Sequence, residues 1–159
     1  MTMIAKKFPT AALIDGEWVT SSKTFSVTDP ATGGEVAAVP NLGAEDAARA
    51  IDAAAKALPA WSAKTAKERA TILSRWFDLV TAETESLAQL MTTEQGKPLA
   101  ESRAEVGYGA SFIEWFAEEG KRAYGRTIPT TVASKRYLTI KQPIGVVAAI
   151  APWNFPIAM

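Results

Sequence analysis

Residues 146–156 read Val146-Val147-Ala148-Ala149-Ile150-Ala151-Pro152-Trp153-Asn154-Phe155-Pro156, the most informative stretch of the sequence. Small and β-branched apolar residues in an unbroken run predict a strand that is buried on both faces. The prolines that follow cannot continue a strand, so a rigid loop is expected at its carboxyl end. Ligands of open α/β sheets bind at that end. Trp153 and Asn154 therefore form a candidate site, with a simple buried loop as the alternative.

The composition limits the functions to consider. Seventeen basic residues balance 17 acidic residues without a long block of either sign, so neither nucleic acid nor a charged lipid surface is an expected partner. The chain has no Cys and no His, which excludes disulfides, zinc sites of the usual kind and thiolate or Ser-His catalysis by these residues alone. No metal site is expected.

The sequence predicts neither a membrane span nor a secretory signal. The apolar run that begins at Gly145 is broken by Pro152 and is too short to cross a bilayer. The first nine residues carry charge with no apolar stretch behind them, unlike a signal peptide. A cytoplasmic location is the expectation.

Short strands are predicted before residue 40. A polar turn separates Ala12-Leu13-Ile14 from Trp18-Val19, and the turn sequence Asp29-Pro30-Ala31-Thr32-Gly33 separates Phe25-Ser26-Val27 from Glu35-Val36-Ala37-Ala38-Val39. These strands have no core of their own.

Apolar residues then recur at helical spacing. A first helix from Ala44 should end at Pro59, and a second should begin at the capping-box sequence Thr65-Ala66-Lys67-Glu68. A third should end at Gly96, and Pro98 should be the first residue of a longer fourth helix. The residues expected on the buried faces of the second and fourth helices are Ile72, Leu73, Trp76, Phe77, Val80, Val106, Phe112, Ile113 and Phe116.

After Gly125 the chain should be extended. Arg136-Tyr137-Leu138-Thr139-Ile140-Lys141 alternates as a strand with two different faces, and Pro143 separates it from the run at 145–150. A strand buried on both faces needs neighbours to pair its backbone groups, and this sequence does not contain them. An incomplete α/β structure is therefore expected.

Few charged residues suggest chemistry. Glu101 and Glu105 are spaced like an acid–base pair, but a solvated first turn that complements the helix dipole is favoured. Lys97 follows Gly96 without the Walker spacing, and no G-x-G-x-x-G occurs, so a helix cap is favoured over a phosphate-binding loop. Asn154 remains: a neutral amide held in place is a suitable donor to a developing oxyanion.

The stretch 146–156 resembles the cofactor strand and Pro-Trp-Asn-Phe-Pro motif of the aldehyde dehydrogenase superfamily. Three further segments match in order: Leu13-Ile14-Asp15-Gly16-Glu17-Trp18, Asp29-Pro30-Ala31-Thr32-Gly33 and Thr93-Glu94-Gln95-Gly96-Lys97-Pro98. Within the superfamily, segments 68–73, 111–122 and 140–146 are most similar to bacterial succinate-semialdehyde dehydrogenases. The resemblance covers nearly the whole chain.

This resemblance implies a fold and its domains. It implies the N-terminal part of an aldehyde dehydrogenase fold, an α/β structure with a Rossmann-like cofactor domain and an oligomerisation arm, incomplete in this chain. Residues 1–126 would supply β-elements and helices of the cofactor-binding domain, and 127–143 part of the arm. Residues 144–159 would supply the first buried strand and the Pro-Trp-Asn-Phe-Pro loop. A homo-oligomer, dimer or tetramer, is implied at full length.

The resemblance also implies an activity: oxidation of succinate semialdehyde to succinate through a cysteine thiohemiacetal, with hydride transfer to NAD or NADP and hydrolysis assisted by a glutamate. Asn154 matches the catalytic amide that stabilises the oxyanion. The cofactor wall matches Ile150, Ala151, Pro152, Trp153 and Asn154.

The nucleophilic Cys and the general-base Glu belong to later parts of the family's chain, so residues 1–159 alone should be inactive. Two alternatives remain open. One is a dehydrogenase for another semialdehyde or an aliphatic aldehyde, and the other is a non-catalytic interaction or assembly fragment.

Overall fold

The computed structural model describes residues 8–159. Residues 1–7 lie outside the described residues; they make up most of the N-terminal stretch in which the sequence predicts no secretory signal. Four strands come first: β1 (Ala12–Ile14), β2 (Glu17–Val19), β3 (Thr24–Thr28) and β4 (Glu35–Pro40). Then come α1 (Ala44–Ser62), α2 (Ala66–Ala82), α3 (Thr84–Gln95), α4 (Leu99–Glu119), the 3-10 turn η1 (Gly120–Arg122), β5 (Arg126–Ile128) and β6 (Tyr137–Thr139). No helix in this range is both long and apolar enough to cross a membrane.

The strands form three separate antiparallel pairs, β1–β2, β3–β4 and β5–β6. The β1–β2 turn uses Asp15 and Gly16 at φ of 52° and 81°, as a tight two-residue hairpin requires. The β3–β4 turn is closed by reciprocal backbone hydrogen bonds, in which Asp29 N donates to Gly34 O at 2.9 Å and Gly33 N donates to Asp29 O at 2.8 Å. The short strands predicted before residue 40 are confirmed.

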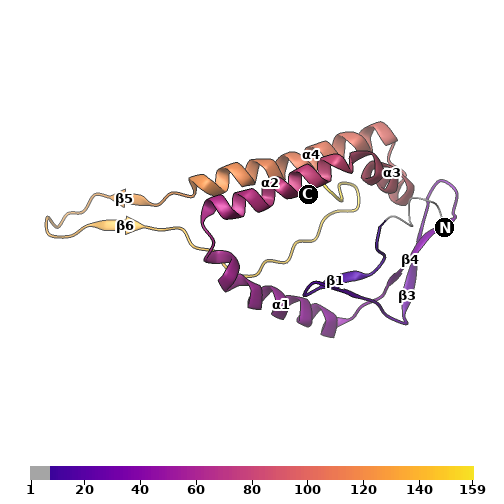
Figure 1. Ribbon diagram of the computed structural model, residues 1–159, viewed down its shortest axis with the longest axis horizontal. Helices are drawn as coiled ribbons and strands as arrows, with labels where there is room; N and C mark the ends of the chain where they lie inside the picture. Colours follow the sequence, from indigo (N-terminus) through magenta and orange to yellow (C-terminus); the bar gives the residue numbers. More distant parts are fainter. Residues whose placement is uncertain (1–7) are drawn as a thin grey trace.

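Helix α4 packs along both α2 and α3, and the β5–β6 hairpin extends away from them (Figure 1). The core beside α3 and α4 centres on Ala88, Met91 and Val106. Ile157, from the end of the chain, packs against this cluster. The C-terminal segment is therefore attached to the helices, although no regular element holds it.

Two helix ends behave as predicted. The Thr65 hydroxyl accepts from Glu68 N at 3.3 Å, and the Glu68 carboxylate accepts from Thr65 N at 2.7 Å, which completes the capping box at α2. Gly96 ends α3 with φ of 79°, in the left-handed region that glycine enters without strain.

Two proline positions differ from the prediction. Helix α1 does not end at Pro59 but continues to Ser62, because the Pro59 carbonyl accepts from Ala63 N at 3.0 Å and completes one more turn. Proline lacks its own donor, yet its carbonyl can still serve the next turn. Pro98 is the N-cap of α4 and Leu99 its first residue, one position later than predicted.

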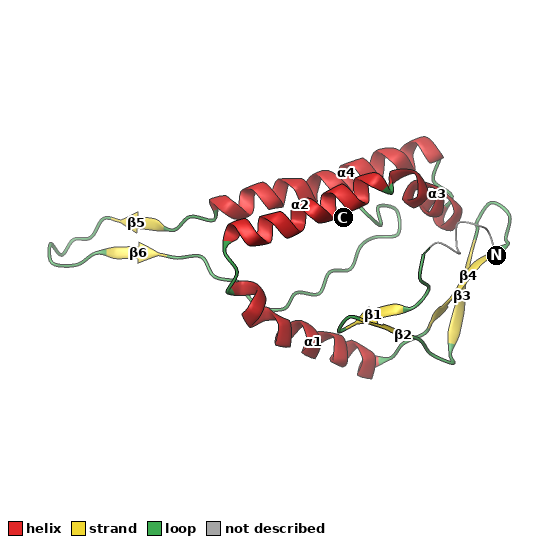
Figure 2. Cartoon of the chain, in the orientation of Figure 1, coloured by secondary structure: helices red, strands yellow, loops and turns green. Residues whose placement is uncertain are grey.

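The predicted buried strand at 146–150 is wrong for this chain. Residues 140–152 have no regular secondary structure (Figure 2), and Ile150 is 97% exposed. The physical reason is that the segment has no neighbouring strand with which to form hydrogen bonds: none of the three strand pairs in the described residues extends to it. Apolar residues of a sheet interior stay exposed when no neighbouring strand is present.

The predicted helix faces are only partly buried. Val106 is buried, and Leu73, Phe77, Val80 and Ile113 are partly buried. The prediction of burial is wrong for the exposed side chains Ile72, Trp76, Phe112 and Phe116. Amphipathic spacing identifies the apolar face of a helix, but no other part of the described residues covers that face here.

Candidate functional site

The Pro-Trp-Asn-Phe-Pro loop lies against α3 and α4. Phe155 N donates to Pro152 O at 3.3 Å, which closes a turn through Trp153 and Asn154. Ala158 is buried, and Ile157 contacts the core cluster. The loop is therefore anchored immediately after the two candidate residues.

Lys97 reaches the loop from the connection between α3 and α4. Its side chain is only 10% exposed, and its ammonium donates to the backbone carbonyl of Asn154 at 2.7 Å. The same ammonium lies 4.3 Å from the centre of the Phe155 ring and forms an ion pair with Glu105. A cation in this position gains a carboxylate, a carbonyl and an aromatic face as partners.

Glu105 holds the other side of the loop. Its side chain is 2% exposed, and its carboxylate accepts from Ile157 N at 3.0 Å as well as from Lys97. A buried carboxylate is tolerated when its charge is paired and its oxygens are hydrogen-bonded. Both conditions are met here.

The environment of Glu105 overturns one expectation. Glu105 is not part of a solvated first turn, whereas Glu101 is exposed, so the two carboxylates do not share an environment. Gly96 forms the predicted helix cap, and the Lys97 side chain, to which the sequence assigned no partner, binds the loop. Sequence reasoning missed this site because its members come together only in the folded chain.

The backbone of the loop is held by hydrogen bonds, while its two candidate residues are exposed. Gln95 Nε2 lies 3.5 Å from the Trp153 carbonyl, at the long limit of a hydrogen bond. The Trp153 residue is 82% exposed, and Asn154 is exposed as well. Asn154 is therefore an exposed residue on a loop whose main chain is fixed, which suits a donor to a ligand oxygen.

The predicted cofactor residues form one exposed strip that leads into the loop. Ile150, Ala151 and Pro152 are all exposed, directly before Trp153. An indole and small apolar side chains are residue types that can pack on a planar ring. A cavity of about 400 Å³ on the α3 side of the loop is lined in part by Trp153, Met91 and Ile157.

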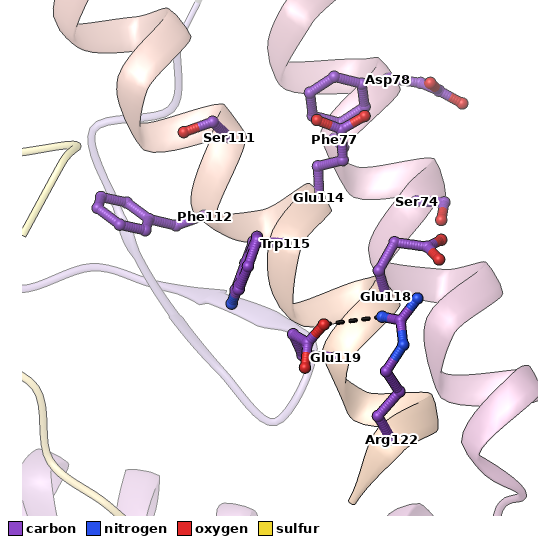
Figure 3. A pocket seen from close by; sticks show the side chains of 10 residues that line it. All are labelled: Ser74, Phe77, Asp78, Ser111, Phe112, Glu114, Trp115, Glu118, Glu119 and Arg122. Atoms are coloured by element: carbon purple, nitrogen blue, oxygen red, sulfur yellow. Dashed lines mark hydrogen bonds and ion pairs between the residues drawn. The ribbon is translucent and has the colours of Figure 1, made fainter.

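A second cavity, of about 820 Å³, lies between α2 and α4 (Figure 3). Phe77, Phe112 and Trp115 supply its apolar lining, and Arg122 donates to Glu119 at 2.7 Å on its rim. None of the predicted site residues lines it. Phe112 and Trp115 belong to the uncovered face of the helices and are 38% and 61% exposed.

Comparison with known proteins gives the family. Residues 18–159 match the Aldehyde dehydrogenase family. The chain is 60% identical over 154 residues to the NADP(+) succinate-semialdehyde dehydrogenase GabD of Escherichia coli (strain K12), a match that covers 96% of this chain and 32% of the relative. It is 58% identical over 157 residues to a glutarate-semialdehyde dehydrogenase of Pseudomonas putida, covering 98% of this chain and 33% of the relative.

A solved structure agrees with the sequence matches. The fold is similar to that of the succinate-semialdehyde dehydrogenase from Burkholderia pseudomallei, with a TM-score of 0.91 and 60% identity over 94% of this chain and 31% of that chain. The chain spans about a third of the length of the curated relatives that it matches. By sequence and by fold, it belongs to the aldehyde dehydrogenase family.

Proposed function

We propose that the full-length protein containing this chain oxidises a semialdehyde to a carboxylate with NAD or NADP. The observation that carries the proposal is the state of Asn154: its main chain is bound by Lys97, and the residue is exposed directly after the strip 150–153. Membership of the aldehyde dehydrogenase family supports the oxidation of an aldehyde, and relatives at 58% and 60% identity carry semialdehyde dehydrogenase names.

The proposed role of Asn154 is to stabilise negative charge on the substrate oxygen. Attack on an aldehyde carbonyl concentrates charge on its oxygen, and an N–H donor that is already in place lowers the energy of that state. An amide stays neutral at every working pH, so this contribution needs no proton transfer. In this proposal Asn154 is the catalytic residue that the chain supplies.

The strip Ile150, Ala151, Pro152 and Trp153 is proposed to form one wall of the cofactor site. When bound, the nicotinamide ring accepts the hydride that leaves the substrate carbon. The chain's own residues would pack against the ring and keep water from it. The backbone around Asn154 would border the same wall.

Succinate semialdehyde is the proposed substrate, and glutarate semialdehyde is the alternative. The relative at 60% identity is named for succinate semialdehyde and the relative at 58% for glutarate semialdehyde. The two molecules differ by a single methylene. Discrimination by one methylene is typically worth about 1–3 kcal/mol in an apolar pocket. NADP is favoured as cofactor because the name of the 60% identical relative includes it.

Assembly and location complete the proposal. The exposed β5–β6 hairpin overlaps the segment proposed as an oligomerisation arm, 127–143, so we infer a homo-oligomer, dimer or tetramer, of the full-length protein. A cytoplasmic location is part of the same proposal.

The test uses the full-length protein, both semialdehydes and both cofactors. Asn154→Ala should lower kcat by about 10²–10³, the usual loss for one oxyanion donor, with little change in cofactor Kd. Trp153→Ala should instead weaken cofactor binding, because it removes packing from the wall. Near-normal kcat for Asn154→Ala, in a variant that keeps its fold and oligomer, would contradict the proposal.

A further inference from the structure

Two buried charges hold the loop from both sides of Phe155. Lys97 binds the carbonyl of Asn154 at 2.7 Å, and Glu105 binds the N–H of Ile157 at 3.0 Å. Because the two side chains also pair with each other, the loop is connected to both the start of α4 and the α3–α4 connection. The position of residues 154–157 is thus fixed by one network.

Water can do little to solvate the two charges of the network. With side chains 10% and 2% exposed, neither Lys97 nor Glu105 has much access to water. Loss of either partner would leave an uncompensated buried charge, so the loop and the pair are held in one arrangement. The Phe155 ring, 4.3 Å from the ammonium, restricts the lysine further.

Close packing supports the same arrangement. A Cβ atom at Gly109 would lie 2.5 Å from Ile157 Cγ2 and 2.8 Å from the Ile157 carbonyl oxygen. The loop therefore contacts α4 directly, one turn beyond Glu105. A shift of the loop toward the helix is blocked by packing, and a shift away from it would break the bonds to Lys97 and Glu105.

We propose that Lys97 and Glu105 are positioning residues for Asn154, which set the direction of its amide by fixing the main chain on which it stands. This inference rests on the proposed role of Asn154 as oxyanion donor. Neither charged side chain needs to touch the substrate. A misplacement of about 1 Å in a catalytic group can cost about 10²-fold in rate, so a main-chain anchor can control turnover.

The first variant is Lys97→Met in the full-length protein, which keeps most of the apolar stem and removes the ammonium. We expect kcat and the first-turnover rate of NAD(P)H formation to fall about 10- to 100-fold. KM for the aldehyde and for the cofactor should change less than about threefold, because Lys97 is not proposed to touch either one.

Arg103→Met is the matched control. Arg103 lies on α4 and pairs with Glu85 of α3 at 2.8 Å, so it joins the same two helices as an exposed pair and does not bind the loop. The kcat of the Arg103→Met variant should stay within about twofold of the kcat of the parent protein. A second test variant, Lys97→Met with Glu105→Gln, avoids the unpaired carboxylate while Asn154 still lacks its donor, and kcat should fall as in the single variant.

The double variant Lys97→Met with Asn154→Ala separates positioning from general stability. If Lys97 acts through Asn154, the double variant should be no slower than Asn154→Ala alone, because the amide to be positioned is gone. Multiplied losses, or normal kcat in Lys97→Met, would overturn the inference while leaving the role of Asn154 intact. If both Lys97 variants failed to fold, the Lys97–Glu105 pair would have a role in stability only, and the inference would be overturned as well. Normal kcat in Asn154→Ala would instead remove the proposed function itself.

Discussion

The ammonium of Lys97 donates to the main-chain carbonyl of Asn154, although 57 positions separate them in the sequence. The contact is to the backbone, so it fixes the residue without engaging the amide. Asn154 itself is exposed. A single lysine thereby connects the helical part of the chain to the residue that we propose to be catalytic.

Two glycines of α4 should respond oppositely to alanine. At Gly109 a Cβ atom would clash with Ile157, whereas at Gly107 it would meet nothing within 4 Å. We expect Gly107→Ala to stabilise the protein by up to about 1 kcal/mol through helix propensity. Gly109→Ala should destabilise it by about 1–3 kcal/mol through overpacking.

The measurement is the free energy of unfolding or the Tm of the two variants beside the parent protein. Each glycine serves as the other's control, because both lie in the same helix and gain the same methyl group. Equal effects of the two substitutions would show that the loop does not rest on Gly109.

The exposed pair Glu85–Arg103 should leave a signature at low pH. Hydrogen bonds from Arg103 and then from Gln89 lower the pKa of Glu85 to about 2. A carboxylate whose folded pKa is depressed contributes stability above its unfolded pKa, near 4.5, and loses that contribution as pH falls toward 2. The contribution itself should be small, because water screens an exposed pair.

Arg103→Gln should therefore lower the urea midpoint slightly at pH 7, and the difference from the parent should shrink below pH 4.5. Glu85→Gln and the double variant complete a cycle that isolates the pair. A difference that stays constant between pH 7 and pH 3 would mean that the pair does not form.

Local signals predicted much of the helical structure. The capping box at Thr65, the left-handed Gly96 and the Asp15-Gly16 turn each depend on neighbouring residues, so their sequence patterns were sufficient. Asn154 and Trp153 were identified because two prolines flank a conspicuous polar and aromatic pair.

The Lys97–Glu105 network had no such local signal. The two residues are eight positions apart across a helix start, and their loop partners come from the other end of the described chain. The strand at 146–150 failed for a related reason. Its apolar pattern describes a place in a larger sheet, and a strand forms only where neighbouring strands complete its hydrogen bonds.

The uncovered helix face should make the isolated 159-residue chain self-associate. Trp76 and Phe116 are 55% and 61% exposed, and Ile72 and Phe112 belong to the same face. We expect concentration-dependent association in light scattering and strong binding of a hydrophobic dye. Trp76→Lys with Phe116→Lys should reduce both signals. A dilute monomer with a sharp cooperative unfolding transition would contradict this expectation.

The isolated chain should also show no aldehyde-dependent reduction of NAD or NADP. Its 159 residues contain no Cys and no His, so they supply no thiolate nucleophile and no imidazole base. Asn154 can stabilise an oxyanion only after a nucleophile has attacked the carbonyl, and the strip 150–153 is one wall of a site that needs others. A preparation shown by mass to contain residues 1–159 alone should give the buffer rate with succinate semialdehyde and either cofactor, while the full-length protein assayed in parallel gives turnover. Measurable turnover by the isolated chain would mean that its lysines, carboxylates or hydroxyls supply the nucleophile, and the proposed division of the chemistry would be wrong.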